Sequence, residues 1–160
     1  MIKELIRQIA CGICKALGGY REEGKEIVES FFPTSKKEIA YEEKMSFLIG
    51  KFPNVPIFGT YKHLLASYDD IAVFMAQDQT NEFPYNFPDF ICSDFSFRLM
   101  GQFSIPGWSE VTFGVVWTDV HALNCILTED MEFYFVEPQA DKLQEELESW
   151  QGSSIRFIMI

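Results

Sequence analysis

The sequence predicts an α+β fold, in which a helical N-terminal half precedes a further helix packed on an antiparallel sheet of about four strands. Before residue 77, apolar residues recur at the spacing of amphipathic helices. After residue 100, segments rich in β-branched and aromatic residues are separated by turn residues, which is typical of strands. With 160 residues, of which 48% are hydrophobic, we expect a single domain over 1–160 with one buried core.

The N-terminal part, residues 1–85, is expected to be mainly helical. A first helix should end at Gly18, because two successive glycines terminate helices readily. A later helix should start after Thr34 or Ser35, with Glu38 completing a capping box. The predicted helical segments are 2–17, 21–30, 36–50 and parts of 61–75, separated by loops over 51–60 and 77–89.

The C-terminal part, residues 86–160, is expected to hold a cysteine-bearing helix and the sheet. The helix begins near Cys92, and Phe95 and Leu99 lie one turn apart on its apolar side. The last segment, 155–160, is nearly all apolar, so we expect a strand inside the sheet rather than at its edge. The predicted elements are a helix over 92–100, strands over 111–117, 122–128, 132–136 and 155–160, and a helix over 141–150.

The composition excludes some partners. The formal net charge is −11, and no basic patch interleaved with aromatic residues occurs, so nucleic acid is not an expected partner. The N-terminus is no secretory signal, and no apolar run reaches transmembrane length. The four cysteines do not form a dense disulfide framework, and we therefore expect a cytoplasmic protein without a membrane partner.

Three side chains near element ends have the chemistry of a thiol hydrolase. Cys92 is placed at a predicted helix start, where amide dipoles lower the pKa of a thiol. His121 precedes one predicted strand, and Glu137 follows the next. A cysteine nucleophile needs a histidine that takes and returns a proton, and a third group that orients the histidine. The sequence therefore indicates Cys92, His121 and Glu137 as a candidate catalytic triad.

The turn between the second and third predicted strands decides whether His121 and Glu137 can meet. If Thr128 pairs with Glu132 around a three-residue loop, Leu123 lies opposite Glu137 and His121 lies diagonally on the same face. A two-residue turn would set the two side chains on opposite faces. No Asn-Gly or similar dipeptide fixes the turn length, so both registers stay open.

An acyl-transfer site also needs hydrogen-bond donors for the oxyanion. The candidates are Gln139, Trp108 and the backbone N–H of Cys92, and the sequence does not rank them. A purely structural alternative stays open as well. In it, Cys92 belongs to the core, His121 is a strand-end residue, and Glu137 is a surface carboxylate.

Three short motifs carry a resemblance to a known family. They are Cys-x-Asp-Phe from Cys92, His-Ala-x-Asn from His121 and Glu-Pro-Gln from Glu137. In this order they resemble the C-terminal domain of the Marasmius-type mushroom agglutinins, and its bacterial and phage stand-alone relatives. That domain is a papain-like, calcium-dependent cysteine protease fused to a β-trefoil lectin. The resemblance covers about residues 89–141, and the sequence contains no β-trefoil lectin.

The resemblance implies a papain-like fold and a role for each matching residue. Cys92 would be the nucleophile, His121 the general base and acid, and Glu137 the residue that orients His121. Asn124 and Gln139 would be supporting amides.

The resemblance also implies calcium, held by acidic residues that follow the cysteine. Asp94 is the matching acid in this chain, whereas Ser93 stands where the family often has a second one. Val120 stands where the family tends to have glycine before the histidine. No other cofactor is expected.

These observations leave three hypotheses of function. The first is a thiol hydrolase, a cysteine peptidase that acts on peptides or proteins. The second is a catalytically inactive member of the same fold that serves as a binding or dimerisation module, for which a homodimer is expected. The third is a redox protein that uses Cys11 and Cys14, although no strand precedes this pair as in thioredoxin-like motifs.

Overall fold

The structure is a computed structural model that describes residues 32–35 and 37–160. The chain divides into one unit of Met1–Ser30 and a second of Phe31–Ile160. All the described residues belong to the second unit.

Some predictions concern residues outside this range. The predicted helices over 2–17 and 21–30 lie outside the described residues, as do Cys11 and Cys14. The prediction of a single domain over 1–160 therefore stays a prediction.

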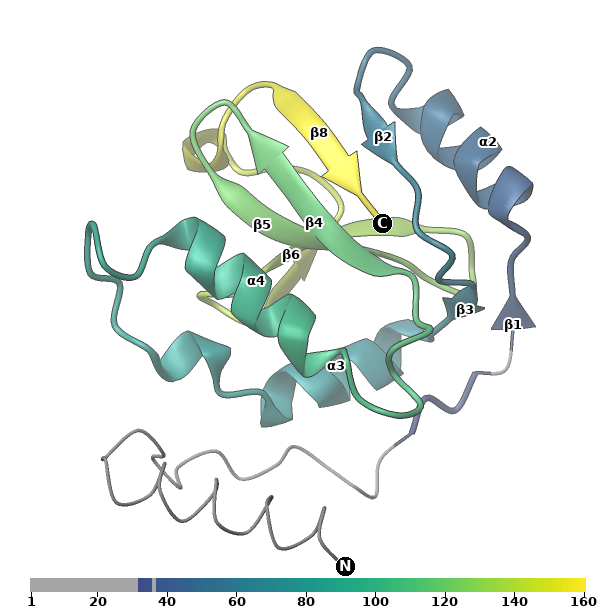
Figure 1. Ribbon diagram of the computed structural model, residues 1–160, viewed down its shortest axis with the longest axis horizontal. Helices are drawn as coiled ribbons and strands as arrows, with labels where there is room; N and C mark the ends of the chain where they lie inside the picture. The colour runs from purple at the N-terminus through teal and green to yellow at the C-terminus, as the bar shows by residue number, and fades with distance from the viewer. Residues whose placement is uncertain (1–31, 36) are drawn as a thin grey trace, which may run out of the picture. The chain divides into compact units, whose positions relative to one another are not determined.

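A six-stranded sheet forms the centre of the described fold (Figure 1). Its strands are β2 (Ile57–Phe58), β4 (Phe113–Thr118), β5 (Ala122–Leu127), β6 (Phe133–Glu137), β7 (Lys142–Gln144) and β8 (Ile155–Met159). The order across the sheet is β2-β8-β4-β5-β6-β7, and all neighbours are antiparallel except β2 and β8, which are parallel. The four longer strands are the predicted ones, and β8 lies inside the sheet as its apolar sequence predicts. The short edge strands β2 and β7 were not predicted.

Helices cover both faces of the sheet (Figure 1). Helices α3 (Tyr68–Gln77) and α4 (Cys92–Gln102) lie on one face, and α2 (Tyr41–Lys51) belongs to the core of the other. Alternation along β5 shows this division, because Ile126 packs with α3 and α4 whereas Leu123 packs with α2. The predicted α+β class is confirmed.

The turn between β5 and β6 has three residues, the length that lets His121 and Glu137 share a face of the sheet. The Thr128 N–H donates to the Glu132 carbonyl at 2.9 Å, which leaves three residues in the loop. Met131 in this loop has φ 60°, in the left-handed region, which accommodates the third loop residue. The register of the β5–β6 ladder therefore sets His121 on the same sheet face as Glu137.

The predicted helix over 141–150 is wrong. This segment forms β7 and a short 3₁₀ helix, η2 (Ser149–Gln151). Asp141, at φ 48°, is the last residue of the turn that joins β6 to β7. Leu143 then lies opposite Val136 in the sheet, so the apolar residue that suggested a helical face pairs with a strand instead.

Helix α2 begins later than predicted, and the predicted capping box is wrong. Its N-cap is Ala40, whose side chain makes no capping bond, and Glu38 lies in β1 (Lys37–Glu38). Thr34 donates its N–H and its hydroxyl to Asp70 Oδ2 at 2.8 and 3.0 Å, so it contacts α3 instead of capping α2.

The segment 61–75 contains a strand before its helix. Strand β3 (Leu64–Leu65) pairs with β1, and Ser67 then caps α3 by accepting the Asp70 N–H at 3.1 Å. The predicted loop over 77–89 holds one helical turn, η1 (Thr80–Glu82). The part of the chain before α4 is thus less helical, over the described residues, than its apolar pattern indicates.

Among the described residues, no helix has both the length and the apolar character needed to cross a membrane. Helices α2 and α4 have 11 residues each, against about 20 for a helix that spans the hydrocarbon core.

Candidate active site

Cys92 is the first residue of α4, and its side chain is partly buried. Asp94 caps this helix end, because its Oδ2 accepts the Ile91 N–H at 2.8 Å. One turn further on, the Ser96 hydroxyl donates to the Cys92 carbonyl at 2.9 Å. These two bonds fix the start of α4 and, with it, the backbone that carries the thiol.

Cys125 is the other thiol of the described residues, and its surroundings are different. It lies fully buried in β5, and burial raises the pKa of this thiol far above its ordinary value. Since the thiolate is the reactive form of cysteine, Cys125 is unsuited to nucleophilic chemistry.

His121 stands at the turn that joins β4 to β5. The Thr118 hydroxyl oxygen accepts the His121 N–H at 2.9 Å, and the Thr118 N–H donates to the His121 carbonyl at 2.9 Å. The residue is only 8% exposed, and its Nε2 lies 2.8 Å from Glu137 Oε2. The structure thus brings together two of the three residues of the predicted triad.

Glu137 is held by further donors. The Gln151 side-chain amide donates to Oε2 at 2.8 Å, and the Gln139 N–H donates to Oε1 at 3.2 Å. Glu137 is 2% exposed, and a carboxylate removed from water needs such partners to remain stable. Together with His121, these donors fix the position of both carboxylate oxygens.

Gln151 is a residue of this site that the sequence alone does not indicate. It is fully buried, and its Oε1 accepts the Glu148 N–H at 2.8 Å. Its neighbour Trp150 presents its ring to His121 at a centroid distance of 4.9 Å and an angle of 61°. Gln151 lies in a segment that the sequence predicts to end a helix, and no residue pattern there pointed to a site.

The contact with Glu137 determines which imidazole nitrogen carries the proton. An ionised carboxylate only accepts hydrogen bonds, so Nε2 of His121 must be the donor at 2.8 Å. Nδ1 then has a lone pair available, and this is the atom that can accept a proton from a nucleophile.

Helix α4 and the His121–Glu137 pair belong to opposite faces of the sheet, at the same end of the β4–β5 hairpin. Asn124, on the α4 face, donates its amide to the carbonyls of Ser96 and Gly114, both at 3.0 Å. The ring of Phe97 packs against Trp117 at a centroid distance of 5.5 Å. The N-terminal half of α4 is therefore fixed against this hairpin (Figure 1).

The described residues include no hydrogen bond between the Cys92 thiol and the His121 ring. Cys92 and His121 are each anchored by bonds to their own backbone neighbours, and the link between α4 and the hairpin runs through Asn124. The structure therefore shows a bound His121–Glu137 pair and a separate Cys92 at the helix start.

The predicted supporting residues lie in three different surroundings. Asn124 joins α4 to the hairpin, and its Oδ1 is buried without a hydrogen-bond partner. Gln139 reaches the site through its backbone N–H. Trp108 is fully buried in the core beside Phe74 and Phe103, at centroid distances of 4.6 and 5.5 Å.

The residues expected to hold calcium do not fit such a role. Asp94, the acid indicated by the resemblance, accepts the Ile91 N–H as a helix cap. Ser93 follows Cys92 where a second acid would be needed. Over the described residues, no group of three or more His, Cys, Asp or Glu side chains is arranged to hold a metal ion.

Comparison with known proteins concerns the fold. No family model and no curated protein matches the chain. The chain is similar to the solved structure of the PSL1a–E64 complex, with a TM-score of 0.63 and 15% identity over 77% of this chain and 50% of that one. It is also similar to Polyporus squamosus lectin bound to the human-type influenza-binding epitope Neu5Acα2-6Galβ1-4GlcNAc, with a TM-score of 0.61 and 15% identity over 77% and 49%.

These similarities agree with the papain-like α+β fold that the resemblance implied. The chain spans about half the length of the two lectin chains. At 15% identity the similarity defines the fold alone.

Proposed function

We propose that the protein is a thiol hydrolase, a cysteine peptidase acting on peptides or proteins, with Cys92, His121 and Glu137 as its catalytic residues. The observation that carries the proposal is the buried His121–Glu137 pair, in which Nε2 is bound and Nδ1 is left as a base. The position of Cys92 at the start of α4 supports it. So does the similarity of the fold to a protein whose structure was solved with E64.

The proposed reaction uses each residue in a defined step. Nδ1 of His121 takes the proton of the Cys92 thiol, and the sulfur attacks the carbonyl carbon of a peptide bond. The imidazolium returns the proton to the leaving amine, which leaves an acyl thioester on Cys92. Water, deprotonated by the same nitrogen, then attacks the thioester, releases the carboxylic acid and restores the thiol.

Glu137 and two donors complete this scheme. Glu137 orients the ring and stabilises the imidazolium through the bond to Nε2. The candidate oxyanion donors are the Cys92 N–H and the side chain of Gln139. The reaction requires the Cys92 sulfur within about 3–4 Å of Nδ1, a contact that is often longer in an enzyme without substrate.

Thiol reactivity tests the proposal without a known substrate. Limiting iodoacetamide at about pH 6 should label Cys92 much faster than the other three cysteines, because only a base-assisted thiol is ionised there. Peptide mass spectrometry gives the rate for each site. His121→Ala should slow the labelling of Cys92 to the rate of an ordinary thiol. His63→Ala, which changes the other histidine of the chain, should leave the labelling rate unchanged. Equal and slow labelling of Cys92 in the wild-type protein would refute the proposal.

A calcium test separates this protein from the family that it resembles. Because the described acids do not fit a calcium site, cleavage of fluorescent casein should proceed at the same rate in EDTA as in millimolar calcium, within about twofold. A rate that depends on added calcium would contradict this expectation.

The second candidate function is a catalytically inactive binding or dimerisation module. The observation that favours it is the separation of Cys92 from His121, which share no hydrogen bond among the described residues. Ser93 and Val120, which depart from the family motifs, favour it as well. Such a protein would label slowly at Cys92, cleave no casein, and sediment as a homodimer in analytical ultracentrifugation.

A further inference from the structure

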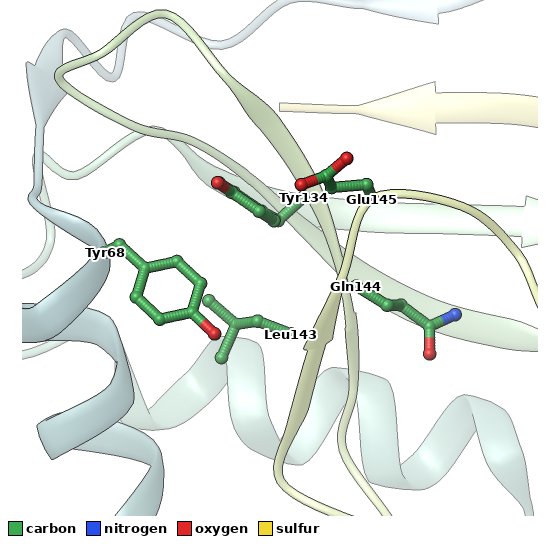
Figure 2. A pocket seen from close by; sticks show the side chains of 5 residues that line it. All are labelled: Tyr68, Tyr134, Leu143, Gln144 and Glu145. Carbon is green, nitrogen blue, oxygen red and sulfur yellow. The ribbon is translucent and has the colours of Figure 1, made fainter.

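A pocket opens on the face of β6 opposite to Glu137 (Figure 2). Its volume is about 510 Å³, within the range of small-ligand sites. Tyr68 comes from α3, Tyr134 from β6, and Leu143 and Gln144 from β7, with Glu145 directly after β7. The two tyrosine rings meet edge to face, with centroids 5.2 Å apart and an angle of 65°.

The lining of this pocket carries a negative charge, that of Glu145, and contains no basic side chain. The pKa of Tyr134 is raised by burial and by the carboxylates of Glu145, Glu132 and Asp130. None of the five residues that line the pocket is basic, and Glu145 is the one acidic residue among them. Lys142, in the adjoining strand, is paired with Glu148 instead.

The pocket also offers surfaces that suit a long side chain. Tyr68 is 42% exposed, so its ring can be reached from solvent. Leu143 is partly buried and lies beside the rings, as Figure 2 shows. Glu145 is exposed, and its carboxylate lies beside Tyr134 in the same view.

We infer that this pocket binds the guanidinium side chain of an arginine residue in a peptide or protein partner. A planar guanidinium can stack on a tyrosine ring while it donates two hydrogen bonds to one carboxylate, here that of Glu145. The apolar stem of arginine can cover Leu143. A neutral apolar group would remove Glu145 from water without a partner, and an anion would be repelled by it.

This inference goes beyond the proposed function and is independent of it. Tyr134 and Glu137 point to opposite faces of β6, and the two tyrosines and Glu145, which carry the inference, have no hydrogen bond to the His121–Glu137 site among the described residues. Gln144 alone links the two, because its side-chain amide donates to Gln151 Oε1 at 2.5 Å. Binding can therefore be measured whether or not Cys92 reacts.

The test is a titration of the full-length protein with N-acetyl-arginine N-methylamide, followed by nuclear magnetic resonance. The probe should shift the ring resonances of Tyr68 and Tyr134 and the methyl resonances of Leu143 in a saturable manner, with a dissociation constant on the order of millimolar. The citrulline analogue has nearly the same shape without the charge. It should bind about tenfold more weakly.

Two glutamate variants separate the pocket from general electrostatics. Glu145→Gln should weaken binding of the arginine probe about tenfold, because it removes the carboxylate of the pocket. Glu146→Gln changes the net charge equally at a neighbouring exposed residue that does not line the pocket, and should leave binding unchanged. Tyr68→Leu should weaken binding less than Glu145→Gln does.

Each contrary result would overturn the inference. Equal binding of the citrulline analogue would show that charge is not recognised. Equal losses in the two glutamate variants would show a diffuse attraction rather than a site. A lysine probe that binds as tightly as the arginine probe would remove the assignment to a guanidinium, and the absence of a saturable shift would remove the site altogether.

Discussion

Strand β6 presents a carboxylate site on one face and an aromatic pocket on the other, and the two differ in how their negative charge is compensated. Glu137 is 2% exposed, and its two oxygens accept bonds from His121, Gln151 and the Gln139 backbone. The pocket beside Tyr134 is lined by Glu145 and by no basic residue.

This difference distinguishes two uses of a carboxylate. A buried carboxylate with all its partners inside the protein can hold another side chain in place, as Glu137 holds His121. A carboxylate beside an open aromatic surface, with no internal partner, has its interactions available to a ligand.

The largest effect should follow from removing the charge of Glu137, the buried carboxylate whose partners lie inside the protein. Glu137→Gln keeps the size of the side chain but removes the charge that, in the proposed reaction, stabilises the imidazolium, so kcat/KM for peptide cleavage should fall by about 10³–10⁴-fold. Initial rates with a fluorescent casein substrate measure this. Glu132→Gln, an exposed change just before the start of the same strand, serves as the control and should leave the rate within about twofold. Equal activity of the two variants would mean that Glu137 has no part in the chemistry.

Gln151→Ala should sharpen the assignment of Gln151 as a positioning residue. It removes one donor from the buried Glu137 carboxylate, so the free energy of unfolding should fall by about 1–3 kcal/mol in urea denaturation. If Gln151 orients the pair, kcat should also fall while KM is maintained. Gln77→Ala is the matched control, because it truncates the same kind of side chain at an exposed residue at the end of α3, outside the site. A Gln151→Ala protein of reduced stability but full kcat would restrict this residue to a structural role.

Asp141, in the turn between β6 and β7, is a further carboxyl group, and its surroundings disfavour its charged form. Burial, followed by the charges of Asp78 and Glu82, raises its pKa to about 6, although its Oδ2 accepts the Asn81 amide at 2.5 Å. A carboxyl group whose pKa is raised by folding contributes stability below its unfolded pKa of about 3.8, and this contribution is lost as the pH rises through about 6.

Asp141→Asn should therefore stabilise the protein at pH 7, on the order of 1 kcal/mol, since the group is partly exposed to solvent. Asparagine also tolerates the left-handed φ of 48° at this position. The difference from wild type should vanish below about pH 4 in urea unfolding. Asp130→Asn, at an exposed residue, controls for net charge, and an equal gain in that variant would contradict the explanation.

The smallest expected effect concerns the pocket beside Tyr134, which is lined by Glu145. Because the Glu145 carboxylate contributes to the raised pKa of Tyr134, Glu145→Gln should lower that pKa toward the ordinary value for tyrosine. Ring resonances of Tyr134 followed through an alkaline titration measure it. High salt should reduce the difference between the variant and wild type, because exposed charges are screened. An unchanged pKa would mean that Glu145 does not act on this ring.

The elements that the sequence predicted well are those whose pattern is local. Phe95 and Leu99 define one side of α4, and both are buried as expected. The segment 141–150 was predicted wrongly because Leu143 and Leu147 fit a helical face as well as they fit an edge strand and the connection after it. Pairing of Leu143 with Val136 decided between these, and such pairing is not visible in a single segment.

Prediction of the candidate site from the sequence has the same limit. The sequence indicated that His121 and Glu137 could meet in one of two registers, and the turn conformation at Met131 selected that one. Gln151 and the pocket residues could not be predicted, because their roles depend on contacts between segments far apart in the chain. The relation between Cys92 and His121 belongs to this group too, since it depends on how α4 packs on the hairpin.

The three-residue turn between β5 and β6 also constrains which changes of length this chain can accept. Deleting one residue between Thr128 and Glu132 would reverse the direction of every side chain in β6. Glu137 would then point toward α4, and Tyr134 would enter the core beside α2, so both sites would be lost together. Surface turns usually accept insertions and deletions freely. In this protein, the number of residues in one short turn is as important to both sites as the identity of the residues that form them.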